Sequence, residues 1–126
     1  MNSAPAYFEL QADDPARAAN FYSQVFAWKF TQAQGLPIEY WRIDAGGHPG
    51  GLLKRPAPLP PPRSGTNAYV CSMQVDNFDA TQQKILSLGG LVALPKFLVP
   101  GRCWQGYFID TEGNTFGMMQ ADAGVQ

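Results

Sequence analysis

The pattern of hydrophobic and polar positions occurs twice along the chain. One block begins at Tyr7 and a similar block begins at Val70, so moving the first by 63 positions (70 − 7) superimposes them. This shift places Asp13-Asp14 on Asp76-Asn77, and each block reads as a strand, an acidic turn, a helix and another strand. The spacing therefore predicts an internal duplication, with one supersecondary unit in each half.

Each block contains one helix with clear start signals. The first is predicted over 15–26, where Asp14 is a favoured N-cap and Pro15 suits the first helical position. The second is predicted over 78–88, capped by Asn77 and ended by the glycines that follow it. In both segments apolar residues recur at helical spacing, so each helix should bury one face.

The remaining apolar segments alternate with polar residues and lie between turns rich in glycine and proline. They predict further strands at 38–43, 50–55, 93–99, 103–110 and 115–120. Two copies of strand, helix and three strands make an α+β chain of two βαβββ modules, which we expect to form a single domain. The modules span about 5–55 and 66–121, joined by a stiff proline-rich linker at 56–65, because a proline run cannot lie in a central strand.

Strand alternation predicts that one face of each sheet is apolar and the other is mixed. In the first strand Phe8, Leu10 and Ala12 share the apolar face, which should pack on a helix. The mixed faces carry polar residues from several strands: Glu9, Gln11, Ser72, Gln74 and Thr115. We therefore expect these faces to form a concave surface directed toward solvent or a ligand.

Composition narrows the class of protein. The 126 residues carry a net charge of −1 and show no basic stripe, which argues against nucleic-acid binding. No apolar run approaches the roughly 20 residues of a membrane span, and the first residues do not read as a secretion signal. These features favour a cytoplasmic location, where Cys71 and Cys103 are expected as buried free thiols rather than as a disulfide.

Three segments give the chain a resemblance to a known family: "ADDPARAANFYSQVFAW", "VDNFDATQQKILSLGG" and "YFIDTEGNTFG". In their order and spacing the chain resembles the vicinal oxygen chelate superfamily, which contains glyoxalase I, extradiol dioxygenases, and fosfomycin and bleomycin resistance proteins. "GGLLKRP" is most similar to a bacterial glyoxalase-like branch. The resemblance implies that the modules curl into a cup-like mixed sheet with two helices outside. It also implies a homodimer.

The resemblance also locates the metal ligands of the family's enzymes, which lie on the first, fourth, fifth and eighth strands. The matching positions here are Tyr7, Val70 and Gly117, while the fourth falls within 50–55, a segment with no acid and no histidine. A catalytic divalent ion needs about three protein ligands, and only the tyrosine could supply one. We therefore expect no metal and no cofactor. Gly117 replaces a carboxylate, and the missing side chains of Gly50, Gly51 and Gly117 should enlarge the cavity.

These expectations favour a metal-independent small-molecule-binding protein of the bleomycin-resistance type, with an apolar or aromatic ligand in the strand cup. Shape, aromatic area and a few polar groups would then hold the ligand. The residues expected to line the site combine aromatic, polar and small side chains: Tyr7, Glu9, Gln11, Tyr40, Arg42, Ser72, Gln74, Trp104 and Gly117.

Other interpretations of the same residues stay open. The chain could be a lyase, an isomerase or a dioxygenase-like enzyme, with Glu9 as general base and Tyr7 as its partner, or with a relocated metal site. Glu9 could instead form a hydrogen bond with a neighbouring strand side chain or with Arg42. His48 lies in a glycine-rich loop, where an exposed histidine without a site is the simpler interpretation. A third possibility is a scaffold whose cup binds nothing.

Overall fold

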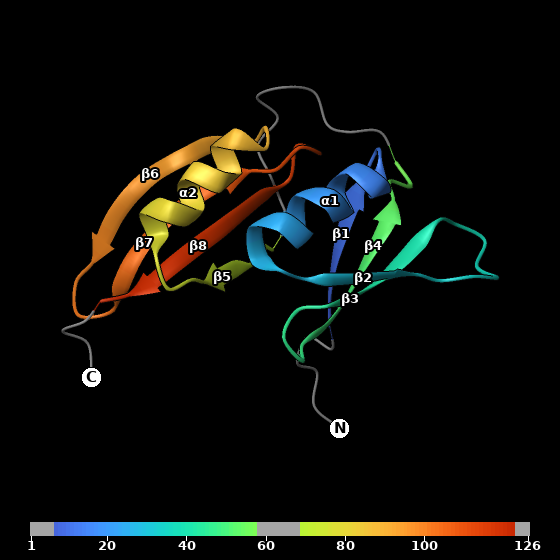
Figure 1. Ribbon diagram of the computed structural model, residues 1–126, viewed down its shortest axis with the longest axis horizontal. Coiled ribbons are helices and arrows are strands. Elements are labelled where there is room, and N and C mark those ends of the chain that lie inside the picture. Colours follow the sequence, from blue (N-terminus) through green and yellow to red (C-terminus); the bar gives the residue numbers. More distant parts are fainter. Residues whose placement is uncertain (1–6, 58–68, 123–126) are drawn as a thin grey trace. The chain divides into compact units, whose positions relative to one another are not determined.

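The computed structural model describes residues 7–57 and 69–122. The chain divides into two compact units, a first unit of Met1–Leu59 and a second unit of Pro60–Gln126. The proline-rich linker predicted at 56–65 lies for the most part outside the described residues. The described residues of each unit form one helix and one four-stranded sheet (Figure 1).

The first unit contains β1 (Phe8–Ala12), α1 (Pro15–Phe26), β2 (Lys29–Gln32), β3 (Tyr40–Asp44) and β4 (Pro49–Lys54). The strand order in the sheet is β1-β4-β3-β2. β1 and β4 are parallel, whereas β4, β3 and β2 are joined antiparallel, so the sheet is mixed. The parallel pair arises because the helix and two strands separate β1 from β4 along the chain.

α1 begins and ends where the sequence predicts. Asp14 Oδ1 accepts a hydrogen bond from the Arg17 N–H at 3.2 Å, and Pro15 occupies the first turn. The helix ends at Ala27, whose φ of 59° is left-handed. α1 packs across one face of the first sheet (Figure 1). The sheet contributes apolar side chains to the core of this unit. They come from even-numbered positions of β1 and β4 and odd-numbered positions of β3: Leu10, Ala12, Trp41, Ile43 and Leu52.

The second unit contains β5 (Ser72–Gln74), α2 (Phe78–Ser87), β6 (Leu91–Val99), β7 (Cys103–Ile109) and β8 (Thr115–Ala121). The strand order is β5-β8-β7-β6, with β5 and β8 parallel and the other pairs antiparallel. The second sheet therefore repeats the topology of the first, position by position.

α2 follows the predicted cap but ends one residue earlier. Asn77 Oδ1 accepts from the Ala80 N–H at 3.0 Å, and Leu88 is the C-cap rather than the last helical residue. The Gly90 N–H returns to the Ile85 carbonyl at 2.9 Å, which closes the helix end. The core beneath α2 consists of fully buried apolar side chains: Phe78, Ile85, Phe108 and Met118.

β6 is the edge strand of the second sheet, and this position explains its sequence. Pro95 removes a backbone donor, which an edge strand tolerates, and the register with β7 shifts between Val92 and Phe97. Five large apolar side chains on β6 are exposed: Leu91, Val92, Leu94, Phe97 and Leu98.

The predicted α+β fold of two βαβββ modules is confirmed. Among the described residues the strands form two open four-stranded mixed sheets, one in each unit. Both cysteines are free, but the prediction that both are buried is wrong for Cys71, which is exposed just before the short β5, while Cys103 is buried. In the described residues neither helix is long and apolar enough to cross a membrane.

Candidate functional site

In the first unit, a row of three residues crosses the sheet on the side away from α1. The register pairs Glu9 on β1 with Gly51 on β4, and Gly51 with Arg42 on β3. Paired positions in a sheet direct their side chains to the same face, so Glu9 and Arg42 flank the glycine. Both side chains are exposed.

Tyr40 covers the glycine in this row. Its hydroxyl occupies the space that a Cβ at position 51 would need, and its ring Cε2 lies 3.2 Å from that point. The same hydroxyl donates a hydrogen bond to Glu9 Oε2 at 3.1 Å. Gly51 is therefore the residue that allows a tyrosine from β3 to reach a carboxylate on β1.

The electrostatics keep the Tyr40 hydroxyl protonated. Burial raises the pKa of Tyr40, and the hydrogen bond to the Glu9 carboxylate and its charge raise this pKa further. Tyr7 also raises the pKa of Tyr40, whereas the positive charge of Arg42 lowers it. The structure thus brings four predicted site residues together around one hydroxyl: Tyr7, Glu9, Tyr40 and Arg42.

Glu9 has a different partner from the one expected for an enzyme. Tyr40, rather than Tyr7, donates to its carboxylate. The alternative that Glu9 accepts a hydrogen bond from a strand side chain is therefore confirmed, although the donor is on β3, one strand beyond the direct neighbour β4. Within residues 7–57 and 69–122, Glu9 has no ion pair and Arg42 has neither an ion pair nor a hydrogen bond.

The second unit contains an equivalent row. The register pairs Ser72 on β5 with Gly117 on β8, and Gly117 with Tyr107 on β7. Gln105 Nε2 donates to Ser72 Oγ at 3.0 Å. A Cβ at position 117 would collide with Ser72 Oγ and would lie 2.9 Å from Gln105 Nε2 and 3.1 Å from Tyr107 Cε1.

The expectation that Gly117 leaves an enlarged cavity is therefore wrong. The Ser72 hydroxyl, the Gln105 amide and the Tyr107 ring fill the space next to the glycine. Gln105 is only 9% exposed, so its amide is held in place and does not leave room for a ligand group at this point. Neighbouring side chains, rather than empty space, occupy the place where the resemblance implies a carboxylate.

The two rows are duplicates of one arrangement. Glu9 and Ser72 are related by the shift of the sequence repeat (9 + 63 = 72), and each pairs with a glycine on the closing strand of its unit. In both units a side chain on the third strand of the unit covers this glycine. Tyr40 donates a hydrogen bond to Glu9 in the first unit, and Gln105 donates one to Ser72 in the second. We call these groups the Tyr40–Glu9 pair and the Gln105–Ser72 pair.

Gln105 was not among the predicted site residues, and Gly51 was expected only to make room by lacking a side chain, a space that the Tyr40 hydroxyl fills. The repeat contained the signal for both, because superimposing the two rows places Gly51 on Gly117 and Gln105 on Tyr40. Finding them requires the strand register, which the sequence pattern alone does not supply.

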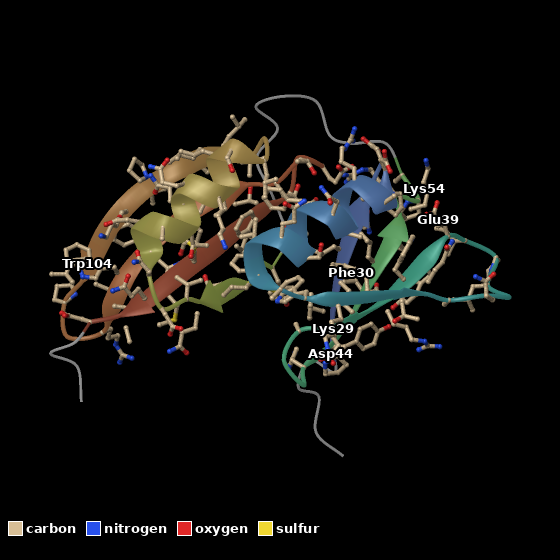
Figure 2. The ribbon with its side chains drawn as sticks, viewed as in Figure 1. Lys29, Phe30, Glu39, Asp44, Lys54 and Trp104 are labelled. Atoms are coloured by element: carbon tan, nitrogen blue, oxygen red, sulfur yellow. The ribbon has the colours of Figure 1, made fainter. Side chains whose placement is uncertain are left out.

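Trp104 lies on the opposite face of the second sheet from Gln105. The Lys96 ammonium lies 4.9 Å from the centre of the Trp104 ring and 5.5 Å from that of Phe78, the first residue of α2. Trp104, labelled in Figure 2, is therefore packed on the helix side. The structure does not bring it to the face that carries the Gln105–Ser72 pair.

The other predicted residues keep their strand faces. Gln11 and Gln74 lie two residues beyond Glu9 and Ser72 on the same strands, and both are exposed. His48 is exposed just before β4, where its ring stacks on Phe8 with a centroid distance of 5.9 Å.

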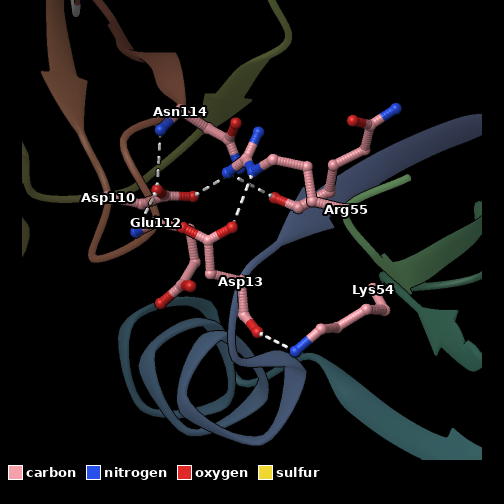
Figure 3. Close-up of polar contacts among 7 residues, drawn as sticks. Asp13, Lys54, Arg55, Asp110, Glu112 and Asn114 are labelled. Atoms are coloured by element: carbon pink, nitrogen blue, oxygen red, sulfur yellow. Dashed lines mark hydrogen bonds and ion pairs between the residues drawn. The ribbon is translucent and has the colours of Figure 1, made fainter. Parts of the chain in front are cut away.

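Several other carboxylates hold turns together. The Asp13 carbonyl oxygen accepts from Lys54 Nζ at 2.8 Å, and Asp13 Oδ1 pairs with Arg55 Nε at 3.1 Å (Figure 3). In the second unit, Asp110 Oδ1 accepts from the Asn114 N–H at 2.9 Å in the turn before β8. These carboxylates have defined structural partners, and we assign them no role in a site.

The donor set does not fit a metal ion of the kind that the resemblance implies. Gly51 is the counterpart of Gly117 in the first unit, and both positions lack a side chain and are covered. Tyr7 and Val70, at the other two positions, are 53% and 42% exposed. Across the described residues, no three His, Cys, Asp or Glu side chains are grouped as metal ligands.

Comparisons with known proteins agree with this fold. Residues 7–119 match the family described as "Glyoxalase-like domain". A "Glyoxylase-like domain-containing protein" of Didymella fabae is 30% identical over 118 residues, and the match covers 85% of this chain and 85% of that protein. "Putative glyoxylase CFP32" of Mycobacterium bovis is 26% identical over 94% of this chain, but the chain spans only 46% of that protein.

A solved structure with the same fold is that of a variant of the fosfomycin resistance protein FosX from Listeria monocytogenes. The TM-score is 0.75 at 15% identity, covering 98% of this chain and 94% of that one. That protein was crystallised with Mn(II) and a dihydroxypropylphosphonic acid. From the family match, the relatives and the duplicated βαβββ fold, we conclude that the chain belongs to the glyoxalase-like domain family, within the vicinal oxygen chelate superfamily.

Proposed function

We propose that this protein binds a small, largely apolar or aromatic molecule on the mixed strand faces and does so without a metal ion. The observation that carries this proposal is the duplicated replacement at Gly51 and Gly117. At both positions a neighbouring side chain covers a bare glycine and forms a hydrogen bond to the first strand. Hydrogen-bonding pairs thus occupy two positions at which the resemblance implies metal ligands, which supports binding without a metal ion.

The exposed residues on these faces suit such a ligand. Tyr7 offers aromatic area at 53% exposure, and the Tyr40–Glu9 pair supplies oriented polar groups beside it. Small-molecule sites combine apolar and aromatic contact area with a few fixed polar groups. The remaining predicted residues, including Gln11 and Gln74, would add polar contacts at the edges of these faces.

A second candidate function is a metal-free lyase or isomerase of the same superfamily, with Glu9 as general base. The Tyr40 hydrogen bond favours it, because a donor that stays protonated fixes the orientation of the carboxylate. The Glu9→Gln variant separates the two functions. A binding protein needs no proton transfer, whereas an enzyme would keep ligand affinity in this variant and lose turnover.

A homodimer and a cytoplasmic location belong to the proposal as well. The exposed apolar side chains of β6 are consistent with burial against a second copy of the chain. Light scattering after size-exclusion chromatography tests the dimer directly. A molar mass of one chain at micromolar concentration would contradict it.

The direct test of the binding function is a thermal-shift screen of small aromatic molecules with and without a chelator. A ligand that binds only the folded protein raises its melting temperature. We expect hits whose shifts are equal in both conditions, because no metal takes part. Shifts that vanish with the chelator would indicate a metal site, and the absence of any hit would favour a scaffold.

A further inference from the structure

We infer that the first unit recognises the polar end of a zwitterionic small molecule, with Glu9 binding its ammonium group and Arg42 its carboxylate. This inference rests on the proposed binding function and names the class of ligand. It follows from the charges on one sheet face, from their spacing and from a comparison between the duplicated units.

Two opposite charges flank one glycine on this face without being paired. Tyr40 occupies one carboxylate oxygen of Glu9, and no cation among the described residues pairs with that carboxylate. Arg42 lies on the other side of Gly51 with its guanidinium unpaired among the same residues. Both groups therefore remain available to a ligand.

The spacing suits a molecule placed between them. Glu9 and Arg42 are two strands apart, which separates their backbones by roughly 10 Å. The Tyr40 hydroxyl lies over the intervening glycine. Because the side chains of Glu9 and Arg42 are long, their charged ends can both reach a small dipolar group that lies over the Tyr40 hydroxyl.

The other charges on the face do not disturb this balance. Lys29 and Asp44, both labelled in Figure 2, are direct partners in the register of β2 and β3 and offset each other's charge, and Asp44 Oδ1 also accepts from the Gly47 N–H at 2.9 Å. Thr31, the β2 partner of Arg42, is uncharged. A ligand over the row therefore meets one negative and one positive group, which favours a zwitterion over a singly charged molecule.

The duplicated unit shows that these charges are not required by the fold. In the equivalent row of the second unit, Ser72 replaces Glu9 and Tyr107 replaces Arg42, with Gly117 between them. In that row a neighbouring side chain also covers the glycine, but no residue of the row is charged. The carboxylate and the guanidinium are thus additions to a common arrangement, as expected for groups that recognise a ligand.

The test uses four aromatic probes of similar size: phenylalanine, phenethylamine, 3-phenylpropionate and 3-phenylpropanol. Their affinities for the intact protein are measured by calorimetry or ligand-observed NMR at low and high salt. We expect phenylalanine to bind about three- to fivefold more tightly than either singly charged probe, since an ion pair with an exposed side chain contributes up to about 1 kcal/mol. Salt should reduce this advantage.

Two variants assign the charges. Glu9→Gln should lower the affinity for phenylalanine to that for 3-phenylpropionate, and Arg42→Gln should lower it to that for phenethylamine. The matched controls are Glu39→Gln, whose carboxylate instead accepts from the Trp41 indole N–H at 3.1 Å, and Lys29→Gln on the neighbouring strand. Neither control should change the ranking of the probes.

The outcomes separate the two proposals. If 3-phenylpropanol binds as tightly as phenylalanine, or if Glu9→Gln leaves the ranking unchanged, the zwitterion inference is overturned while the binding function stands. If no probe binds the wild-type protein at millimolar concentration, both the inference and the aromatic binding function are overturned.

Discussion

Substituting alanine for Gly117 tests the covered-glycine arrangement in the second unit. The backbone at this position lies outside the left-handed region, so alanine meets no conformational penalty. The new Cβ would collide with Ser72 Oγ and would lie 2.9 Å from Gln105 Nε2. To accommodate it, the Ser72 hydroxyl must rotate and the Gln105–Ser72 hydrogen bond must break.

The magnitude follows from these contacts. Gln105 is 9% exposed, and without Ser72 its amide N–H keeps only a long contact of 3.4 Å to the Gly106 carbonyl, so the loss costs about 1–3 kcal/mol. Replacing glycine by alanine offsets about 0.4–1 kcal/mol of this by reducing the entropy of the unfolded chain. We therefore expect Gly117→Ala to lower the free energy of unfolding by about 1–2 kcal/mol.

The assay is urea denaturation, in which a lower midpoint at an unchanged slope reports a loss of stability. Ser72→Ala serves as the control background, because it removes the hydroxyl that collides with the new methyl group. In this background Gly117→Ala should cost close to nothing. A stabilising effect of Gly117→Ala in the wild type, or costs that add to within about 0.5 kcal/mol, would refute the reasoning.

Two further predictions concern single side chains. Because the pKa of Tyr40 is raised above the ordinary value near 10, folding contributes stability below that pH and loses it as the pH rises through the folded-state pKa. Tyr40→Phe should abolish this loss in urea denaturation at alkaline pH, and an unchanged profile would contradict the assignment. Lys96→Met should destabilise the second unit by about 0.5–1 kcal/mol, because Lys96 Nζ lies 3.2 Å from Asp79 Oδ1 and 4.9 Å from the Trp104 ring centre. The loss should be accompanied by altered tryptophan fluorescence, and wild-type stability and emission would argue against this contact.

The helices could be predicted closely from the sequence because their signals are local. The caps at Asp14 and Asn77 both accept a backbone N–H, and α1 has the predicted bounds. The repeat shift also predicted the topology of the second unit from the first. The resemblance then matched positions in this chain to the metal ligands of the family's enzymes. The strand register identifies Gly51 as the position on the fourth strand.

The sequence could not predict that neighbouring side chains occupy the space beside Gly51 and Gly117. This outcome depends on contacts between strands that are distant in the sequence. Tyr40 reaches Glu9 across Gly51 only in one register of β3, β4 and β1. Similarly, alternation separates Trp104 from Gln105, but the packing of Lys96 against Phe78 and Trp104 decides which of the two faces α2. A missing side chain in a sequence therefore does not by itself indicate space in the fold.

Metal content is the direct test of the proposal that this protein works without a metal ion. The protein, purified without a chelating tag, is incubated with Zn, Ni, Mn and Fe(II), desalted, and analysed for metal per chain by mass spectrometry. Because Gly51 and Gly117 carry no ligand and their places are taken by the Tyr40–Glu9 and Gln105–Ser72 pairs, we predict occupancy near zero for every ion. One ion bound per chain would contradict the claim and restore metal-dependent chemistry as the leading function.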